Sequence, residues 1–131
     1  MNWRDLKENG INTLGGLTSG GLDSCTATHW LSENGFAVNC FTVDLGQPDE
    51  ESLDAVVQRL LSCGADSANI IPGQQPLAEA GLSIIQAQAR YEGGYWNTTG
   101  IARPVTVRAV LPELDANGIN VLFHGATGRG N

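Results

Sequence analysis

The stretch Ser19-Gly20-Gly21-Leu22-Asp23-Ser24 lies where an apolar run gives way to a helical pattern. Its two adjacent glycines let the backbone approach a ligand closely and turn N–H groups inward. The helix that follows directs its positive dipole end and free N–H groups at the same point, which suits phosphate. Ser19 and Ser24 supply hydroxyl groups, and Asp23 can hold Mg²⁺ against phosphate oxygens. The stretch predicts a phosphate-binding loop, although a Gly-Gly pair by itself also marks plain tight turns.

Apolar runs and helical patterns alternate along the rest of the chain. The patterns predict strands at 11–18, 36–45, 68–71 and 120–123, and helices at 24–34, 49–64, 76–89 and 104–118. Residues 92–101, which carry aromatic and hydroxyl side chains, are predicted to form a loop, with Pro104 opening the last helix. Gly15-Gly16 makes the first strand the weakest of the four predictions. The alternation indicates an α/β fold with a doubly wound parallel sheet.

Three unusual loops each follow a predicted strand, at residues 19–24, 46–48 and 124–131. In a parallel sheet, ligands bind outside the carboxyl ends of the strands. We therefore expect these loops to meet at one edge and to form a shared site. This placement favours a ligand-binding role for the 19–24 loop over that of an ordinary tight turn.

Composition limits the classes of function. The chain has 131 residues, enough for one domain with a core, and a net charge of −7. That charge, with basic residues scattered, argues against a nucleic-acid surface. Cys25, Cys40 and Cys63 have no CxxC spacing and are expected to be buried thiols in a reducing compartment. No signal peptide or membrane-spanning run is evident, so a cytoplasmic location is expected.

Four stretches resemble the nucleotide-binding domain of argininosuccinate synthase. Residues 19–24 are similar to the pyrophosphate loop (PP-loop) of enzymes that cleave ATP between its α- and β-phosphates. The same loop occurs in asparagine and GMP synthetases and in tRNA thiolation enzymes, so it does not select one family. Three further stretches do: Asp44-Leu-Gly-Gln-Pro-Asp-Glu (44–50), Tyr95-Trp-Asn-Thr-Thr with Ala102-Arg103-Pro104, and His124-Gly-Ala-Thr-Gly-Arg-Gly-Asn131.

The resemblance implies an adenine nucleotide alpha hydrolase-like (HUP, Rossmann-like) three-layer domain. It also implies an ATP- and Mg²⁺-dependent ligase of arginine biosynthesis, in which the citrulline oxygen attacks the α-phosphate and the aspartate amine then displaces AMP. No residue is assigned as a general base, so catalysis is expected to depend on positioning and charge stabilisation.

The resemblance also assigns residues to ligands. ATP would be bound by Leu17, Thr18, Ser19, Gly20, Gly21, Leu22, Asp23, Ser24, Cys25, Val43 and Gly125, with Asp23 also holding Mg²⁺ through the phosphates. Citrulline would be bound by Tyr95, Thr99 and Asn131, and aspartate by Thr127 and Asn131. From the residues alone, Tyr95 is as readily a packing anchor and Thr99 a turn residue.

The resemblance covers about Leu17 to the end of the chain. We expect residues 1–10 to be a polar leader or short surface helix, and 11–131 to be the ATP-binding domain. The family continues into a large synthetase domain that carries further substrate contacts and the oligomer interface. We therefore expect the isolated chain to be inactive, and a homo-oligomer, a tetramer in the family, only in a full-length form.

Three positions depart from the family pattern. Thr18 replaces an aromatic residue, Gly100 stands where many members have a serine that contacts citrulline, and Gly15-Gly16 interrupts a usually apolar strand. Two alternatives therefore stay open. One is a non-catalytic ATP-binding module, and the other is a divergent ATP pyrophosphatase-type ligase that acts on another acceptor.

Overall fold

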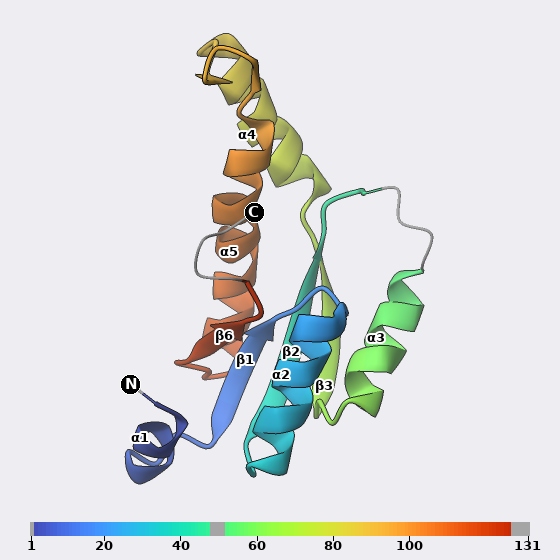
Figure 1. Cartoon of the computed structure of the whole chain (residues 1–131), viewed down its shortest axis with the longest axis vertical. Helices are drawn as coiled ribbons and strands as arrows, with labels where there is room; N and C mark the ends of the chain where they lie inside the picture. Colours follow the sequence, from blue (N-terminus) through green and yellow to red (C-terminus); the bar gives the residue numbers. More distant parts are fainter. Residues whose placement is uncertain (1, 48–51, 127–131) are drawn as a thin grey trace.

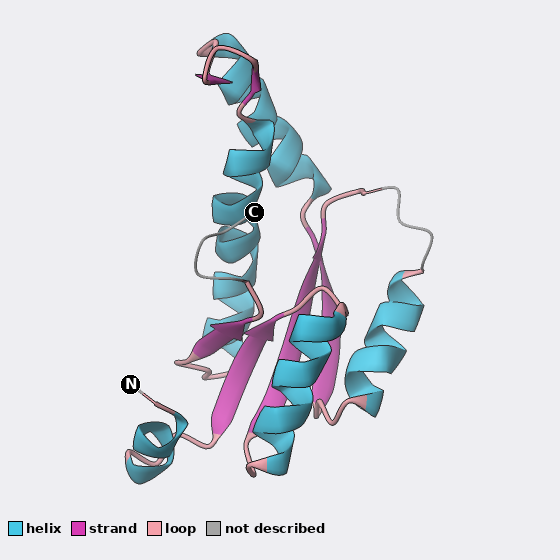
Figure 2. Ribbon diagram, in the orientation of Figure 1, coloured by secondary structure: helices cyan, strands magenta, loops and turns pink. Residues whose placement is uncertain are grey.

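The computed structural model describes residues 2–47 and 52–126 and is a layered α/β domain (Figures 1 and 2). Its elements, in chain order, are α1 (Trp3–Glu8), β1 (Thr13–Leu17), α2 (Leu22–Glu33), β2 (Ala37–Asp44), α3 (Leu53–Ser62), β3 (Ser67–Pro72), α4 (Gln74–Gln86), β4 (Arg90–Tyr91), β5 (Tyr95–Trp96), α5 (Thr98–Ala116) and β6 (Leu122–His124).

Four strands form one parallel sheet in the order β3-β2-β1-β6. Helices α2 and α3 lie on one face, and the C-terminal part of α5 lies on the other (Figure 1). The doubly wound, three-layer prediction is confirmed. The order places β1 at the centre, between the strand that follows α2 and the strand that follows α5.

Two apolar clusters hold the layers together, one on each face of the sheet. Alternate residues of a strand point to opposite faces, so neighbouring side chains of β2 enter different clusters. The α2–α3 face buries Leu14, Leu31, Phe36, Val38, Cys40, Val56 and Leu60. The α5 face buries Phe41, Ile71, Val110, Leu114 and Ile119.

The glycine pair in β1 is explained by its neighbours. A Cβ on Gly16 would lie within contact of the Phe123 ring, and a Cβ on Gly15 would meet Leu114 at 2.5 Å. Because glycine has no side chain, the Phe123 ring of β6 and the Leu114 side chain of α5 can pack directly onto the backbone of β1. Gly15-Gly16 therefore belongs to a fully formed central strand.

The segment between α4 and α5 differs from the prediction. Residues 92–101 were expected to form a loop, but Tyr95–Trp96 pairs with Arg90–Tyr91 as an antiparallel hairpin. Helix α5 begins at Thr98, so Pro104 lies inside the helix and does not open it. Packing between α4 and α5 extends the helix past the residue that usually marks a boundary.

The N-terminal residues form a short capped helix. The Asn2 side chain accepts hydrogen bonds from the backbone N–H groups of Arg4 and Asp5, and the Asp5 carboxylate accepts from the Asn2 N–H. Trp3 and Leu6 pack against the cluster on the α2–α3 face, and the Trp3 ring meets Trp30 edge-on at 5.5 Å. These contacts attach α1 to the domain.

Candidate functional site

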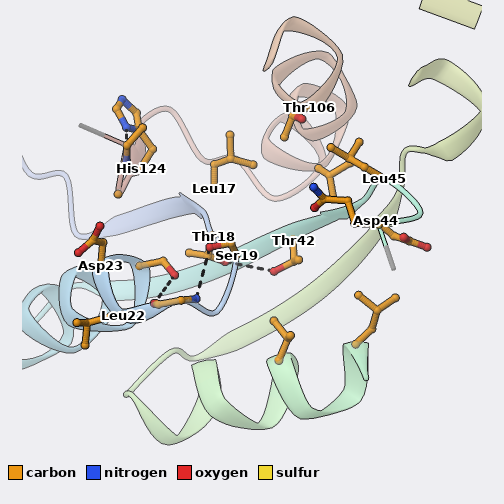
Figure 3. Close-up of a pocket in the computed structure, with 18 of the residues that line it drawn as sticks. Leu17, Thr18, Ser19, Leu22, Asp23, Thr42, Asp44, Leu45, Thr106 and His124 are labelled. Atoms are coloured by element: carbon orange, nitrogen blue, oxygen red, sulfur yellow. Dashed lines mark hydrogen bonds between the residues drawn. The ribbon is translucent and has the colours of Figure 1, made fainter. Parts of the chain in front are cut away.

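A cavity of about 650 Å³ opens at the carboxyl ends of β1, β2 and β6 (Figure 3). Its walls come from the β1–α2 loop, the end of β2 and the residues after it, the first turn of α3, the start of α4, the middle of α5 and the end of β6. The lining residues are Leu17, Thr18, Ser19, Gly21, Leu22, Asp23, Ser24, Thr42, Val43, Asp44, Leu45, Gly46, Gln47, Leu53, Val56, Gln74, Thr106, His124, Gly125 and Ala126. The predicted loop at 19–24 meets here, as expected, with the described parts of the loops at 46–48 and 124–131.

The β1–α2 loop presents backbone donors to this cavity. Gly21 is the N-cap of α2, and no side chain caps the helix there. The first N–H groups of a helix lack partners within the helix, and the helix dipole places partial positive charge beside them. The open N-terminus of α2 therefore faces the cavity as a site for an anion.

The two serine hydroxyls of the loop bond to different backbone groups. Ser24 is buried, and its Oγ donates to the Gly21 carbonyl at 2.9 Å. Ser19 is exposed, and its Oγ accepts from the Gly21 N–H at 3.4 Å. Both hydroxyls therefore hold the loop backbone, Ser24 from a buried position and Ser19 from an exposed position that lines the cavity.

The floor of the cavity is built by the ends of β1 and β2. Thr18 is buried, and its backbone N–H donates to the Phe41 carbonyl at 3.0 Å, which carries the strand pairing one residue past Leu17. Its hydroxyl lies 3.4 Å from that of Thr42 (Figure 3). This chain thus has a hydroxyl pair between two strands at the floor of the cavity.

Asp44 is fixed at the opposite side of the cavity, at the end of β2. One carboxylate oxygen accepts from the Gly46 N–H at 2.8 Å, and the other accepts from the Gln74 amide at 2.8 Å. These bonds tie the β2–α3 loop to the first turn of α4. They also hold a negative charge at a fixed place in the wall.

The β6 end approaches the first turn of α2. A Cβ on Gly125 would lie 3.2 Å from the Ser24 nitrogen and 3.3 Å from the Asp23 Cβ. The His124 Nδ1 accepts from the Ala126 N–H at 3.2 Å, which makes this histidine part of the local turn. A side chain at residue 125 would therefore crowd the first turn of α2.

The described side chains that line the cavity provide too few metal ligands to hold a metal ion unless a bound molecule supplies the others. In the described part of the chain, no group of three or more His, Cys, Asp or Glu side chains could hold a metal ion. Asp23 and Asp44 nevertheless place two carboxylates on the cavity wall. Mg²⁺ is commonly held by one or two carboxylates plus substrate phosphates, so these residues fit an ion that arrives with a nucleotide.

Two thiols lie behind the loop. Burial and the neighbouring Cys63 thiol raise the pKa of Cys25, whose Sγ donates to the Gly20 carbonyl at 3.3 Å. Burial also raises the pKa of Cys40, whose Sγ lies 3.5 Å from the Thr28 hydroxyl. A raised pKa keeps a thiol protonated, so both act as small packing residues rather than as nucleophiles.

The sequence from residue 17 to residue 131 matches the model of the arginosuccinate synthase N-terminal HUP domain. The match begins at the end of β1 and includes every segment that lines the cavity. The chain belongs to the argininosuccinate synthase family. It is accordingly a nucleotide-binding domain of an ATP-dependent ligase type. Among the described residues, no helix has both the length and the apolar character needed to cross a membrane.

Most residues that the family resemblance assigns to ATP line the cavity. Nine do so: Leu17, Thr18, Ser19, Gly21, Leu22, Asp23, Ser24, Val43 and Gly125. Gly20 and Cys25 are not lining residues; the Gly20 carbonyl accepts from both Arg59 and Cys25 on the side of α3.

Tyr95, which the family resemblance assigns to citrulline, does not line the cavity. Tyr95 lies in the β4–β5 hairpin with 60% of its surface exposed, and Thr99 follows in the first turn of α5. Figure 1 shows this hairpin at the far end of the α4–α5 pair, beyond the edge of the sheet where the cavity opens. Thr127 and Asn131 lie outside the described residues.

Several lining residues were not expected from the sequence. Thr42 and Thr106 are the clearest cases, because each lies inside a predicted strand or helix with no glycine, motif or charge cluster to mark it, and Gln74 lies in the short link between a predicted strand and a predicted helix. The Thr106 hydroxyl donates to the Ala102 carbonyl at 2.8 Å, a bond typical of any helical threonine. The sequence did mark Asp44, because this residue lies at the end of an apolar run and begins the 44–50 motif.

Proposed function

We propose that this chain is the ATP-binding part of an argininosuccinate-forming ligase, which joins citrulline to aspartate and releases AMP and pyrophosphate. The observation that carries the proposal is the convergence of the Gly20-Gly21 loop, the open N-terminus of α2 and Gly125 on one cavity. That arrangement supplies backbone donors to an anion, as a departing pyrophosphate requires. Family membership gives the ligase type, and the acceptor and amine are our assignment.

We assign the triphosphate to the loop side of the cavity and the nucleoside to the β2 side. The loop side carries N–H groups and the positive end of the α2 dipole, which favour phosphate. The β2 side carries Val43 and Leu45 beside the hydroxyl of Thr42, a mixed surface that suits a base and a sugar. Charge that develops between the α- and β-phosphates would then lie next to fixed donors.

We assign Mg²⁺ to Asp23, which lies on the side of the cavity assigned to the triphosphate. When bound, the ion neutralises phosphate charge and orients the phosphates. Asp23 lies in the first turn of α2. At that position its carboxylate is stabilised by the helix dipole and is carried on the same element as the N–H donors.

We assign citrulline to Tyr95, Thr99 and Asn131, and aspartate to Thr127 and Asn131, as the family pattern suggests. Tyr95 and Thr99 lie on the α4–α5 pair, which projects from the same edge of the sheet as the cavity (Figure 2). Tyr95 does not line the cavity, so this one acceptor contact is separate from the nucleotide contacts. We therefore propose that the isolated 131-residue chain binds ATP without turnover, in a protein of the cytoplasm.

The test is calorimetry with ATP and Mg²⁺ on the unaltered chain and on Asp23→Ala. We expect the variant to bind about tenfold more weakly with Mg²⁺ present, because one charge-assisted contact is worth about 1.5–3 kcal/mol. Without Mg²⁺ the two proteins should bind ATP with nearly equal affinity. Asp54→Ala, in the first turn of α3, is the matched control for removing a carboxylate from a helix N-terminus.

Equal affinity of Asp23→Ala and the unaltered chain in the presence of Mg²⁺ would exclude the metal role of Asp23. Absence of ATP binding by the unaltered chain would exclude the proposed nucleotide site. Formation of argininosuccinate by this chain alone, given ATP, citrulline and aspartate, would contradict the separation of nucleotide and acceptor contacts.

A further inference from the structure

Arg59 reaches the β1–α2 loop from helix α3, 39 residues further along the chain. Its Nη1 donates to the Gly20 carbonyl at 2.8 Å in a half-buried position. Arg59 does not line the cavity, whereas Val56, one turn earlier on α3, does.

The same face of α3 packs against Gly20. A Cβ on Gly20 would lie 2.7 Å from Cγ1 of Val56, which is one turn before Arg59 on the helix. Gly20 also has φ +72°, a left-handed conformation that glycine adopts without strain. The backbone at Gly20 is therefore set by three features at once: its own conformation, the Val56 contact and the Arg59 hydrogen bond.

The direction of the Gly20 carbonyl decides the direction of the next N–H group. In a planar trans peptide the C=O and the following N–H point to opposite sides. Because the Gly20 carbonyl points to α3, the Gly21 N–H points away from α3. It donates to the exposed Ser19 Oγ at 3.4 Å, and both residues line the cavity, where a phosphate oxygen could replace that hydroxyl as its acceptor. A cationic donor on the carbonyl also polarises the peptide and strengthens its N–H as a donor.

We propose that Arg59 is a positioning residue that fixes the Gly20–Gly21 peptide with its N–H directed at the bound phosphate. The inference rests on the proposed ATP site and adds a residue to it that makes no contact with the cavity. Its chemical consequence is specific: loss of the guanidinium should weaken the binding of phosphate groups and leave the nucleoside side of the cavity unaffected.

The experiment is an NMR titration of the ¹⁵N-labelled 131-residue chain with ATP, inorganic pyrophosphate and adenosine. Arg59→Met keeps much of the apolar stem and removes the donor. Arg108→Met, on the exposed surface of α5, removes the same charge away from the loop. We expect Arg59→Met to bind ATP and pyrophosphate about tenfold more weakly, as for loss of one charge-assisted hydrogen bond, and adenosine as the unaltered chain does.

Two readouts separate positioning from general support of the fold. Arg59→Lys, which keeps a cationic donor, should recover part of the lost pyrophosphate affinity. In the unaltered chain the Gly21 amide resonance should move on addition of pyrophosphate, a result that needs no variant and therefore holds even if Arg59→Met fails to fold.

The outcomes that overturn the inference are distinct from those that overturn the ATP site. Pyrophosphate affinity that is equal in Arg59→Met and the unaltered chain, or a Gly21 amide that pyrophosphate does not move while ATP binds, overturns the role of Arg59 alone. Equal losses for adenosine and pyrophosphate show a structural role and also overturn it. No binding of ATP or pyrophosphate by the unaltered chain overturns the proposed site together with the inference.

Discussion

The β1–α2 loop and the β4–β5 hairpin are both assigned to substrates by family resemblance, yet they are built in opposite ways. The loop follows the central strand, and its backbone is held by Arg59, Ser24 and Val56. The hairpin has two residues in each strand and rests on ring contacts, with the Arg90 guanidinium 4.3 Å from the centre of the Trp96 ring. A site made of backbone donors is preorganised by the fold, whereas a site made of exposed side chains depends on what approaches it.

The largest expected effect compares one glycine from each region. Gly20 and Gly93 have nearly the same positive φ, +72° and +73°, but a Cβ would strike Val56 at Gly20 and meets nothing within 4 Å at Gly93. Gly20→Ala should lower the free energy of unfolding by about 2–5 kcal/mol, from backbone strain plus overpacking. Gly93→Ala should cost about 1–2 kcal/mol, from strain alone.

Urea denaturation of both variants measures this difference. Equal losses at the two positions would mean that Val56 moves aside without cost, and the loop would then be no more rigidly supported than the hairpin.

A second pair of glycines tests binding. Gly125→Ala would place a Cβ 3.2 Å from the Ser24 nitrogen and crowd the N-terminus of α2, whereas Gly94→Ala makes only an ordinary contact with the Tyr91 carbonyl. We expect about a tenfold loss of ATP affinity in Gly125→Ala, equivalent to about 1.4 kcal/mol, and no change in Gly94→Ala. Calorimetry with ATP measures both affinities. An unchanged affinity in Gly125→Ala would show that the end of β6 is not part of the nucleotide site.

The thiols behind the loop give a smaller, pH-dependent effect. Burial raises the pKa of Cys40 above its ordinary value, so the folded protein holds this proton more tightly than the unfolded chain does. The protonated thiol therefore contributes its full stabilisation of the folded state below the ordinary thiol pKa. That contribution is lost as the pH rises from the ordinary pKa through the raised pKa of the folded protein. The free energy of unfolding should therefore fall above about pH 9, with a slope of at most about 1.4 kcal/mol per pH unit from one thiol.

Chemical denaturation between pH 7 and pH 10.5 measures that slope, and Cys40→Ala should make it shallower. The comparison uses the slope and not the absolute stability, because the alanine also leaves a cavity in the core. A slope identical in Cys40→Ala would show that Cys40 does not contribute to it.

The smallest expected effect lies in the hairpin. Tyr95 contacts Tyr91 with ring centres 5.5 Å apart and lies outside the cavity, so Tyr95→Ala should change ATP affinity less than about twofold, within about 0.4 kcal/mol. The free energy of unfolding of Tyr95→Ala should be lower by less than about 1 kcal/mol, because the Tyr95 side chain is already exposed. A large loss of ATP affinity in Tyr95→Ala would place the hairpin over the cavity and remove the contrast between the two regions.

The four-stranded parallel sheet and the site at its carboxyl edge were predictable because both depend on local patterns. The run at 36–45 is apolar on both faces, as a strand covered by helices requires. The Gly20-Gly21 pair before a helix has few uses other than a tight turn or an anion site. Thr106 and Gln74 were not predictable, since their place in the cavity depends on how helices pack from the far side of the sheet.

The sequence by itself determined the order of the four strands of the main sheet and of the helices between them, the Gly-Gly loop and the ligase family, because hydrophobic period, glycine placement and motif spacing are local. Tertiary structure alone decided three things. Gly15-Gly16 became a central strand because Phe123 and Leu114 pack onto it, and α5 ran through Pro104 because α4 packs beside it. The Gly21 N–H was turned toward the cavity because Arg59, distant in sequence, holds the carbonyl on the other side of the peptide. Each depends on contacts between segments that are far apart in the chain, which no local pattern records.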